Sequence, residues 1–298
     1  MIKNFFEINK IEYIENASLK KYNTYRVNTI CKYLVFPKNR LELVKILQMI
    51  LKEKVKFYIL GNGSNVIFSM EYYDGIIIKL DKLNNLIHKD NLITVEAGYP
   101  LIKLALTAID KSLSGLEFAA GIPGQVGAST AMNAGAYNSD MSMIVKEVEV
   151  LCLDEDCKIK KLSNKELKYS YRNSILKNNP NLIVISTTFK LKPGDKEEMK
   201  LQAETRRQKR LESQPLNYPS AGSVFRNPEN MYAGQLIEEC NLKGYSIHGA
   251  EVSTKHANFI INKGEATGKD IIKLINKVKE EVKSKDNVEL KLEQIIIK

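Results

Sequence analysis

The sequence predicts an α+β fold with a large N-terminal domain and a smaller C-terminal one. Segments whose apolar residues recur at helical spacing are interspersed with short, β-branched segments. The length of 298 residues is sufficient for two domains. A strongly charged helical pattern over residues 196–212 separates a C-terminal part from the rest and is interpreted as a helix that connects two domains.

The elements of the N-terminal part follow from hydrophobic spacing. Residues 1–20 are expected to form a polar helix or arm, and residues 23–37 a turn followed by a strand. Leu43, Leu47 and Ile50 lie on one face of an expected amphipathic helix over 41–52. The remaining expected elements here are strands over 57–60, 75–80 and 92–97 and a helix over 101–111.

The C-terminal half contains further strands and two helices. Thr267 and Asp270 have the spacing of a capping box, which predicts the start of a helix whose apolar residues include Ile271 and Leu274. Alternating apolar and charged residues predict a half-buried strand over 288–293. The other expected elements are strands over 145–153, 157–162, 182–191 and 258–262 and the helix over 196–212.

Composition and cysteine usage indicate a cytoplasmic protein, and its net charge is compatible with a small anionic substrate. Hydrophobic residues make up 44% and charged residues 27%, without an apolar run that could span a membrane or a signal-peptide core. The net charge of +10 is dispersed, and the basic run Arg206–Arg210 splays around a helix, so nucleic acid is not an expected partner. Four scattered cysteines are interpreted as reduced thiols, not as a metal site.

The stretch from Gly115 to Tyr137 is dominated by Gly, Ala and Ser and has no Lys, Arg or Asp. Such small residues let the backbone approach another group closely, and the amides of residues 124 and 127–129 could then hold an anion. The alternative is backbone-on-backbone packing without a ligand. A second glycine-bearing loop, Gly61–Asn65, follows the expected strand over 57–60 and offers another set of amides.

Common nucleotide and catalytic motifs are absent. The loop at Gly61 and Gly63 lacks the third glycine of a Rossmann fingerprint, and residues 264–269 are one residue short of P-loop spacing. There is no Gly-x-Ser-x-Gly elbow, and the three histidines form no metal cluster. A nucleotide cofactor therefore requires another architecture.

The two glycine loops together resemble the flavin-binding pair of the UDP-N-acetylenolpyruvoylglucosamine reductase family, in the shorter form typical of Gram-positive bacteria. The resemblance covers nearly the whole chain. Its further motifs are Tyr171–Ser174, Gln214–Leu216, Tyr218–Pro228, Ala233–Ile237 and Val252–Phe259. It implies an FAD-binding domain of the vanillyl-alcohol-oxidase (PCMH) type over residues 1–195, with subdomains of roughly 1–80 and 81–195. Residues 196–298 would form an α+β substrate-binding domain.

The resemblance also implies the reaction and its participants. The family transfers hydride from NADPH through non-covalent FAD to the enolpyruvyl group of UDP-N-acetylglucosamine enolpyruvate, which gives UDP-N-acetylmuramate for peptidoglycan. A monomer is favoured, with no membrane insertion. The residues expected at the FAD are Gly61, Asn62, Gly63, Ser64, Asn65, Gly121, Gly124, Gly127, Ala128, Ser129, Asn133 and Gly135.

Three residues are assigned to catalysis by the resemblance. Ser223 donates the proton, Arg172 stabilises charge on the carboxylate side, and Glu293 relays a proton to the far oxygen. Without the resemblance, the three residues would be interpreted as a turn serine, a surface arginine and an exposed strand glutamate. Substrate contacts are expected from Arg226, Asn227 and Gln235.

The sequence departs from the family pattern at three places. Asn28-Thr29 replace a usual Gly-Gly, Met70 replaces an Asp, and Arg226 replaces a Lys. One rival function is an FAD-dependent sugar or alcohol oxidase of the same superfamily, although no histidine lies beside a glycine loop to attach flavin covalently. The other rival is a basic binding protein without enzymatic activity, which rests on net charge alone.

Overall fold

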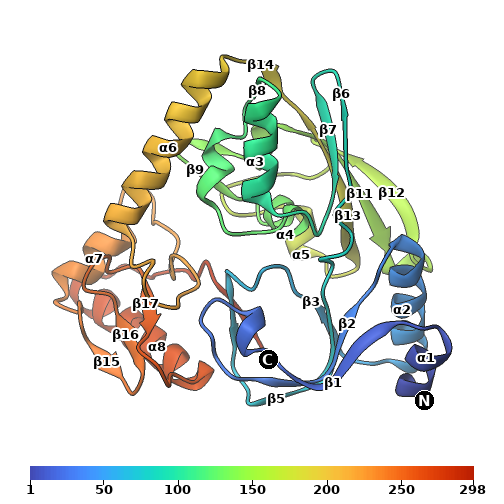
Figure 1. The fold of residues 1–298 in the computed structure, drawn as a ribbon. Coiled ribbons are helices and arrows are strands. Elements are labelled where there is room, and N and C mark those ends of the chain that lie inside the picture. Colours follow the sequence, from blue (N-terminus) through green and yellow to red (C-terminus); the bar gives the residue numbers. More distant parts are fainter. The chain divides into compact units, whose positions relative to one another are not determined.

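A computed structural model describes residues 1–298, and the chain divides into two compact units (Figure 1). Unit 1 comprises residues 1–15, 33–61 and 75–208, and unit 2 comprises residues 16–32, 62–74 and 209–298. Each unit has its own apolar core, one centred on residues such as Phe6 and Phe189 and the other on residues such as Tyr25 and Phe225. No helix is both long enough and apolar enough to cross a membrane.

One sheet has the strand order β1-β2-β5-β3, and the division between the units passes through β1, β2 and β5. β3 and β5 are parallel, with Ile59 opposite Ile78. The strands are β1 (Glu12–Ser18), β2 (Ile30–Phe36), β5 (Tyr72–Ile78) and β3 (Phe57–Ile59). Because β1 is largely exposed, its sequence has no alternating apolar pattern, and the expectation of only a helix or arm over residues 1–20 missed this strand.

Two helices of unit 1 come from the N-terminal part of the chain, α1 (Ile2–Ile8) and α2 (Arg40–Glu53). The prediction of α2 is confirmed. Asn39 caps its first turn by accepting a hydrogen bond from the Glu42 amide at 2.9 Å, and Leu43, Leu47 and Ile50 are buried. Lys54 ends the helix in a left-handed conformation.

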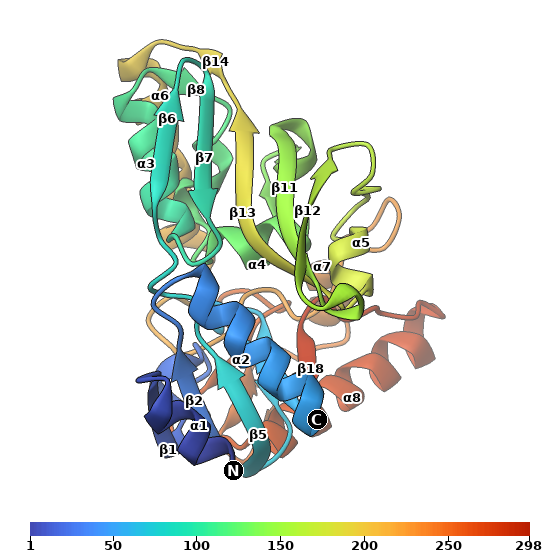
Figure 2. The same cartoon turned by 90° about the vertical axis from the view of Figure 1, so that its right-hand side faces the viewer.

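The largest sheet lies wholly in unit 1, and its strands run side by side in the order β12-β11-β13-β7-β6 (Figure 2). Neighbouring strands are antiparallel. The strands are β6 (Leu86–Lys89), β7 (Leu92–Glu96), β11 (Val145–Cys152), β12 (Lys158–Ser163) and β13 (Leu182–Lys190). The helix α4 (Val126–Ala131) packs against β13, where the Thr130 and Thr187 hydroxyls lie 3.0 Å apart.

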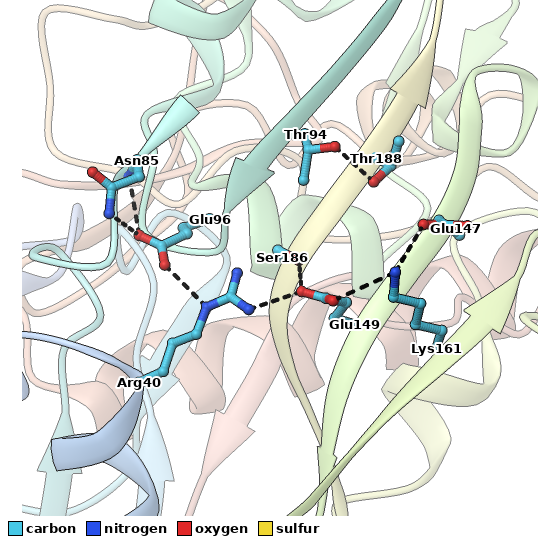
Figure 3. A network of polar contacts seen from close by, with 9 residues as sticks. All are labelled: Arg40, Asn85, Thr94, Glu96, Glu147, Glu149, Lys161, Ser186 and Thr188. Carbon is cyan, nitrogen blue, oxygen red and sulfur yellow. Dashed lines mark hydrogen bonds and ion pairs between the residues drawn. The ribbon is translucent and has the colours of Figure 1, made fainter. Parts of the chain in front are cut away.

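A polar network covers the sheet face opposite Thr187 (Figure 3). Arg40, the first residue of α2, pairs with Glu96 of β7 at 3.1 Å and with Glu149 of β11 at 2.9 Å. Burial acts to raise the pKa of Glu149, but hydrogen bonds from Ser186 and Arg40 outweigh it and hold that pKa below its usual value. The network therefore fixes the start of α2 on the central strands of the sheet.

The rest of unit 1 consists of short elements and one long helix. These are α3 (Leu101–Asp110), β8 (Leu113–Ser114), the 3-10 helices η2 (Glu117–Gly121), η3 (Met141–Met143) and η4 (Leu153–Glu155), β9 (Gly135–Ala136), β10 (Ser139–Asp140), α5 (Ile175–Asn178), β14 (Lys192–Pro193) and α6 (Lys196–Ser213). α6 begins in unit 1 and ends in unit 2. The helices predicted over 101–111 and 196–212 are thus confirmed.

Unit 2 is built around α8 (Gly268–Asp286), whose predicted capping box is present with both reciprocal hydrogen bonds between Thr267 and Asp270. The strand predicted over 288–293 is wrong. Only Leu292 forms an isolated bridge there, and the ladder forms later, where β18 (Ile295–Ile297) pairs in parallel with β4 (Val66–Phe68). The other elements are η1 (Lys20–Tyr22), α7 (Ala233–Glu239), β15 (Ser246–Ile247), β16 (Ala250–Val252) and β17 (Ile260–Asn262).

Candidate active site

The glycine-rich stretch, residues 115–137, forms η2, a loop and the short helix α4 within unit 1. A Cβ added to Gly127 would lie 2.7 Å from the Ala97 Cβ, and one added to Gly124 would lie 2.7 Å from the Ser129 Oγ. The Gly127 amide donates to the Ala97 carbonyl at 2.9 Å, and the Gly124 amide donates to Ile122 at 2.9 Å. Close packing within the chain therefore accounts for the small residue at both positions.

The loop Gly61–Asn65, called the first glycine loop below, approaches the glycine-rich stretch, called the second glycine loop, at Gly61 within unit 1. A Cβ added to Gly61 would be 3.1 Å from the Ala128 Cβ and 3.6 Å from the Gln125 Oε1. Ala128 is exposed and belongs to the first turn of α4, where amide groups have no partner within the helix. Gly61 and the start of α4 therefore face each other at a spacing that a larger side chain would widen.

Asn133 and Gly135 shape the end of the stretch. Asn133 has a φ of +48° and is buried, and its side-chain amide donates to the Ser170 carbonyl at 2.9 Å and to Asp140 at 3.1 Å. The Gly135 carbonyl accepts a hydrogen bond from Arg172 Nη2 at 2.8 Å. Arg172, itself at a φ of +54°, is thereby held next to the glycine-rich stretch.

The remainder of the first loop, Asn62–Asn65, belongs to unit 2. Gly63 has a φ of +66°, and an added Cβ would lie 2.2 Å from the Tyr22 carbonyl oxygen, so this position requires glycine. The Asn65 side chain donates to the Glu293 carbonyl at 3.3 Å, and the Asn65 carbonyl accepts from the Ile295 amide at 2.9 Å. The loop is thus attached to the strand segment that carries Glu293.

Ser223 lies in a loop over residues 221–227, called the serine loop below. Its hydroxyl forms no hydrogen bond, whereas the backbone around it is firmly fixed. The buried Gln294 amide donates to the carbonyls of Ala221 and Gly222, each at 3.1 Å. The buried Asn258 side chain accepts from the Phe225 amide and donates to the Phe225 carbonyl, both at 2.9 Å. The serine loop thus holds a half-buried hydroxyl available on a rigid backbone.

Glu293 lies beside the serine loop. Its amide donates to the Val224 carbonyl at 2.9 Å, next to the antiparallel bridge between Phe225 and Leu292. A Cβ added to Gly222 would lie 4.0 Å from the Ser64 carbonyl oxygen. Unit 2 therefore brings together Ser223, Glu293 and the part of the first glycine loop that belongs to it.

The three expected substrate-binding residues differ in how their side chains are engaged. The Arg226 Nε is buried and has no hydrogen-bond partner, as a group waiting for a ligand would be. The Asn227 Oδ1 accepts from the Ala233 amide at 3.1 Å and so stabilises the start of α7. Gln235 is exposed, and its amide donates to Glu239 at 2.8 Å.

Two of the three departures from the family pattern, at residues 28–29 and at residue 70, lie together in unit 2. The Thr29 hydroxyl donates to the Met70 carbonyl at 2.7 Å, and the Ile30 amide donates to the Glu71 carbonyl at 2.8 Å. Asn28 and Thr29 have no positive φ, so this turn has no need of the usual glycines. The Thr29 hydroxyl thus contacts the backbone of residue 70, and nothing in the structure explains the Met70 side chain itself.

These residues fit a bound FAD. Within unit 1, Gly61 and the first turn of α4 approach each other at a position that a Cβ would crowd, and Ala128 of that turn is exposed. Gln294, Asn258 and Tyr25 were not among the predicted site residues. The Tyr25 hydroxyl donates to Gln294 at 3.0 Å. Gln294 stands between Glu293 and Ile295 and has no motif of its own that could have indicated its role.

Known protein families match an N-terminal and a C-terminal segment of this chain. Residues 31–163 match the family described as FAD binding domain, and residues 214–297 match the UDP-N-acetylenolpyruvoylglucosamine reductase C-terminal domain. A UDP-N-acetylenolpyruvoylglucosamine reductase from Caldanaerobacter subterraneus is 45% identical over 92% of this chain and 90% of its own length. A second reductase of this name, from Clostridium novyi, is 43% identical over 97% of this chain and 94% of its own length. The crystal structure of the Thermus caldophilus reductase superposes with a TM-score of 0.81 at 32% identity, covering 97% of this chain and 99% of that one.

Proposed function

Because the chain belongs to the UDP-N-acetylenolpyruvoylglucosamine reductase family, we propose that it reduces UDP-N-acetylglucosamine enolpyruvate to UDP-N-acetylmuramate for peptidoglycan synthesis. FAD is the cofactor and NADPH the reductant. The observation that supports this most directly is the hydroxyl of Ser223, which forms no hydrogen bond on a loop held rigid by Gln294 and Asn258. A general acid needs such a fixed and available proton. The alternative of a sugar or alcohol oxidase is not favoured by these relatives.

The reaction adds a hydride and a proton across the double bond of a vinyl ether. Bound FAD supplies the hydride, which is received by the terminal carbon. Negative charge then develops on the adjacent carbon and spreads into the carboxylate of the substrate. Ser223 delivers the proton to that adjacent carbon, because a hydroxyl is acidic enough for a strongly basic enolate when it is held at about 3–3.5 Å.

Arg172 and Glu293 are proposed to act on the oxygens. One nitrogen of the planar Arg172 guanidinium is anchored on the Gly135 carbonyl at 2.8 Å, and we propose that this group also binds the substrate carboxylate. The Glu293 amide donates to the Val224 carbonyl at 2.9 Å, and the Glu293 carboxyl group is proposed to relay a proton to the far enolate oxygen. Arg226, Asn227 and Gln235 are proposed to contact polar groups of the nucleotide sugar.

The residues proposed to hold FAD come from both glycine loops. In the first loop they are Gly61, Asn62, Gly63, Ser64 and Asn65, and in the second Gly121, Gly124, Gly127, Ala128, Ser129, Asn133 and Gly135. Residues 1–195 are proposed as the FAD-binding domain and residues 196–298 as the substrate-binding domain. We further propose that the protein acts in the cytoplasm, where NADPH and nucleotide sugars are found. We also propose that it is a monomer and that it has no nucleic-acid or membrane partner.

A visible absorption spectrum of the purified protein tests the proposed function. We expect a flavin spectrum that bleaches when NADPH is added without oxygen and returns when the enolpyruvyl nucleotide is added. Flavin that is released into the supernatant by acid confirms non-covalent attachment. A colourless protein, or a reduced flavin that is reoxidised by oxygen and not by the enolpyruvyl nucleotide, would contradict the proposal.

A further inference from the structure

A buried lysine lies beneath the first glycine loop. Lys79 directly follows β5, and Gly61 lies two residues after β3. Because β3 and β5 are parallel neighbours with Ile59 opposite Ile78, the ends of both strands bring Lys79 and Gly61 together within unit 1. The Lys79 side chain is only 5% exposed, which is rare for a lysine.

The Lys79 ammonium and two other side chains connect the two glycine loops. Its Nζ donates to the Gly61 carbonyl and forms an ion pair with Asp81 at 3.3 Å. The same Asp81 oxygen accepts a hydrogen bond from the Gln125 Nε2 at 2.5 Å. Gln125 is the N-cap residue of α4, the helix at the centre of the second loop. A continuous chain of polar contacts therefore runs from Gly61 to the start of α4.

These contacts determine the direction of backbone groups. The carbonyl and the following amide of a planar trans peptide point in opposite directions, and the chain has no cis peptide bonds. By holding the Gly61 carbonyl, Lys79 turns the next amide, that of Asn62, away from itself. By holding the Gln125 side chain, Asp81 fixes the residue whose position sets the first turn of α4.

Stability alone does not explain this arrangement. Burial lowers the pKa of the Lys79 ammonium, and the ion pair with Asp81, whose side chain is 43% exposed, opposes that shift only in part. Only the lysine end of this pair is buried, and apolar residues often replace buried charges at little cost or with a gain in stability. The charged pair is thus poorly suited to stabilising the fold and well suited to holding polar backbone groups in a defined geometry.

We propose that Lys79, Asp81 and Gln125 form a loop clasp that sets the spacing and orientation of the two glycine loops and thereby the affinity for FAD. All three are positioning residues, since they act through the loop backbone. The inference rests on the proposed function in one respect, that these loops hold FAD.

Titration of apoprotein with FAD, followed by the change in flavin fluorescence, tests the loop clasp. We expect Lys79→Met to raise the dissociation constant for FAD about tenfold or more, because a charge-assisted hydrogen bond to the loop is lost. The thermal midpoint of the apoprotein should stay unchanged or rise. The matched control is Lys82→Met, which removes an exposed lysine paired with Glu12 and should leave both quantities unchanged. An unchanged FAD affinity of Lys79→Met, or a weaker one that only accompanies a lower midpoint, overturns the proposal.

A second variant decides the matter even if Lys79→Met fails to fold. Asp81→Asn retains an oxygen for Gln125 but removes the charge that pairs with Lys79, and its partly exposed position favours folding. We expect weaker FAD binding by this variant. We also expect Lys79→Met/Asp81→Asn to bind FAD no more weakly than Lys79→Met, because the effects of substitutions that remove the same ion pair do not add. An unchanged affinity of Asp81→Asn, or additive losses, overturns the clasp. Failure of the unchanged protein to reduce the enolpyruvyl nucleotide despite binding FAD would contradict the proposed function instead.

Discussion

The glycine-rich stretch of unit 1 and the serine loop of unit 2 both depend on small residues, but for different reasons. Gly127 has an ordinary backbone conformation, and an added Cβ would lie 2.7 Å from the Ala97 Cβ. Gly222 has space around it, with the Ser64 oxygen 4.0 Å from an added Cβ, but its φ of +74° disfavours any other residue. Glycine in the first region permits close packing, and in the second it permits a turn that presents a hydroxyl.

The two regions also differ in what their polar groups do. In the glycine-rich stretch, the amides of Gly124 and Gly127 and the side chain of Asn133 are bound to other parts of the same unit. In the serine loop, Gln294 and Asn258 bind the backbone and leave the Ser223 hydroxyl without a partner. Substitutions in the first region should therefore affect folding and FAD binding, and a substitution at Ser223 should affect only the reaction.

The largest effect is expected from Ser223→Ala, which tests the second half of this comparison. Loss of a general acid typically slows a reaction by about 10²–10⁴-fold, and we expect about 10³-fold in reoxidation of the reduced flavin by the enolpyruvyl nucleotide. Flavin reduction by NADPH and the thermal midpoint should not change, because the hydroxyl forms no hydrogen bond in the folded protein. Stopped-flow absorbance measures each half-reaction separately. Equal rates for both proteins in the second half-reaction would contradict the role of Ser223.

Gly127→Ala tests the first half of the comparison. Its Cβ would overlap with Ala97, and we expect the free energy of unfolding to fall by about 3 kcal/mol, at the upper end of the cost of overpacking. FAD binding should weaken as α4 shifts. Chemical denaturation and FAD titration measure the two effects. The matched variant is Gly127→Ala/Ala97→Gly, which removes the opposing Cβ and should be more stable than Gly127→Ala alone. A double variant that is no more stable than Gly127→Ala would show that this contact is not the cause.

Sequence reasoning succeeded where a local pattern determines the structure. The helices over 40–53 and 268–286 follow from apolar spacing and from caps at Asn39 and Thr267, and both are present. The strand predicted over 288–293 is wrong, because alternating apolar and charged residues indicate which side chains are buried but not which segment pairs with another strand. Pairing occurs at Ile295–Ile297, where β4, more than two hundred residues earlier in the chain, provides the partner.

The candidate site was predictable to a similar extent. The glycine loops and Ser223 have motifs that can be read in the sequence, whereas Lys79 and Gln294 have no motif of their own. Lys79 acquires its position from the parallel pairing of β3 and β5, and Gln294 from contacts to Ala221 and Gly222 that span more than seventy residues. Contacts at such separations depend on the whole fold and leave no local signal.

Gln294→Ala is expected to have an intermediate effect, and it distinguishes support of the serine loop from the serine itself. Its loss leaves the Ala221 and Gly222 carbonyls and the Tyr25 hydroxyl without their partner, which should lower the free energy of unfolding by about 2 kcal/mol. The rate of substrate reduction should fall less than in Ser223→Ala. Urea denaturation and steady-state kinetics measure both quantities. Gln202→Ala on the exposed face of α6 is the control and should change neither. A stable Gln294→Ala would contradict the support role.

The smallest expected effect is a pH dependence of the free energy of unfolding that arises from His256, a residue in contact with the support of the serine loop. The His256 Nδ1 accepts a hydrogen bond from the Asn258 amide at 3.2 Å, and Asn258 in turn holds Phe225. Burial lowers the pKa of His256 below its ordinary value of 6.5, with a smaller contribution from the charge of Lys243. The unfolded chain therefore binds the proton more tightly, so the free energy of unfolding should fall as the pH drops below about 6.5. His256→Asn keeps an acceptor at that position without titrating, and its denaturation curves at pH 5–8 should lose this part of the slope. Equal slopes for both proteins would show that protonation of His256 is not coupled to folding, and the serine loop would then be insensitive to pH through this contact.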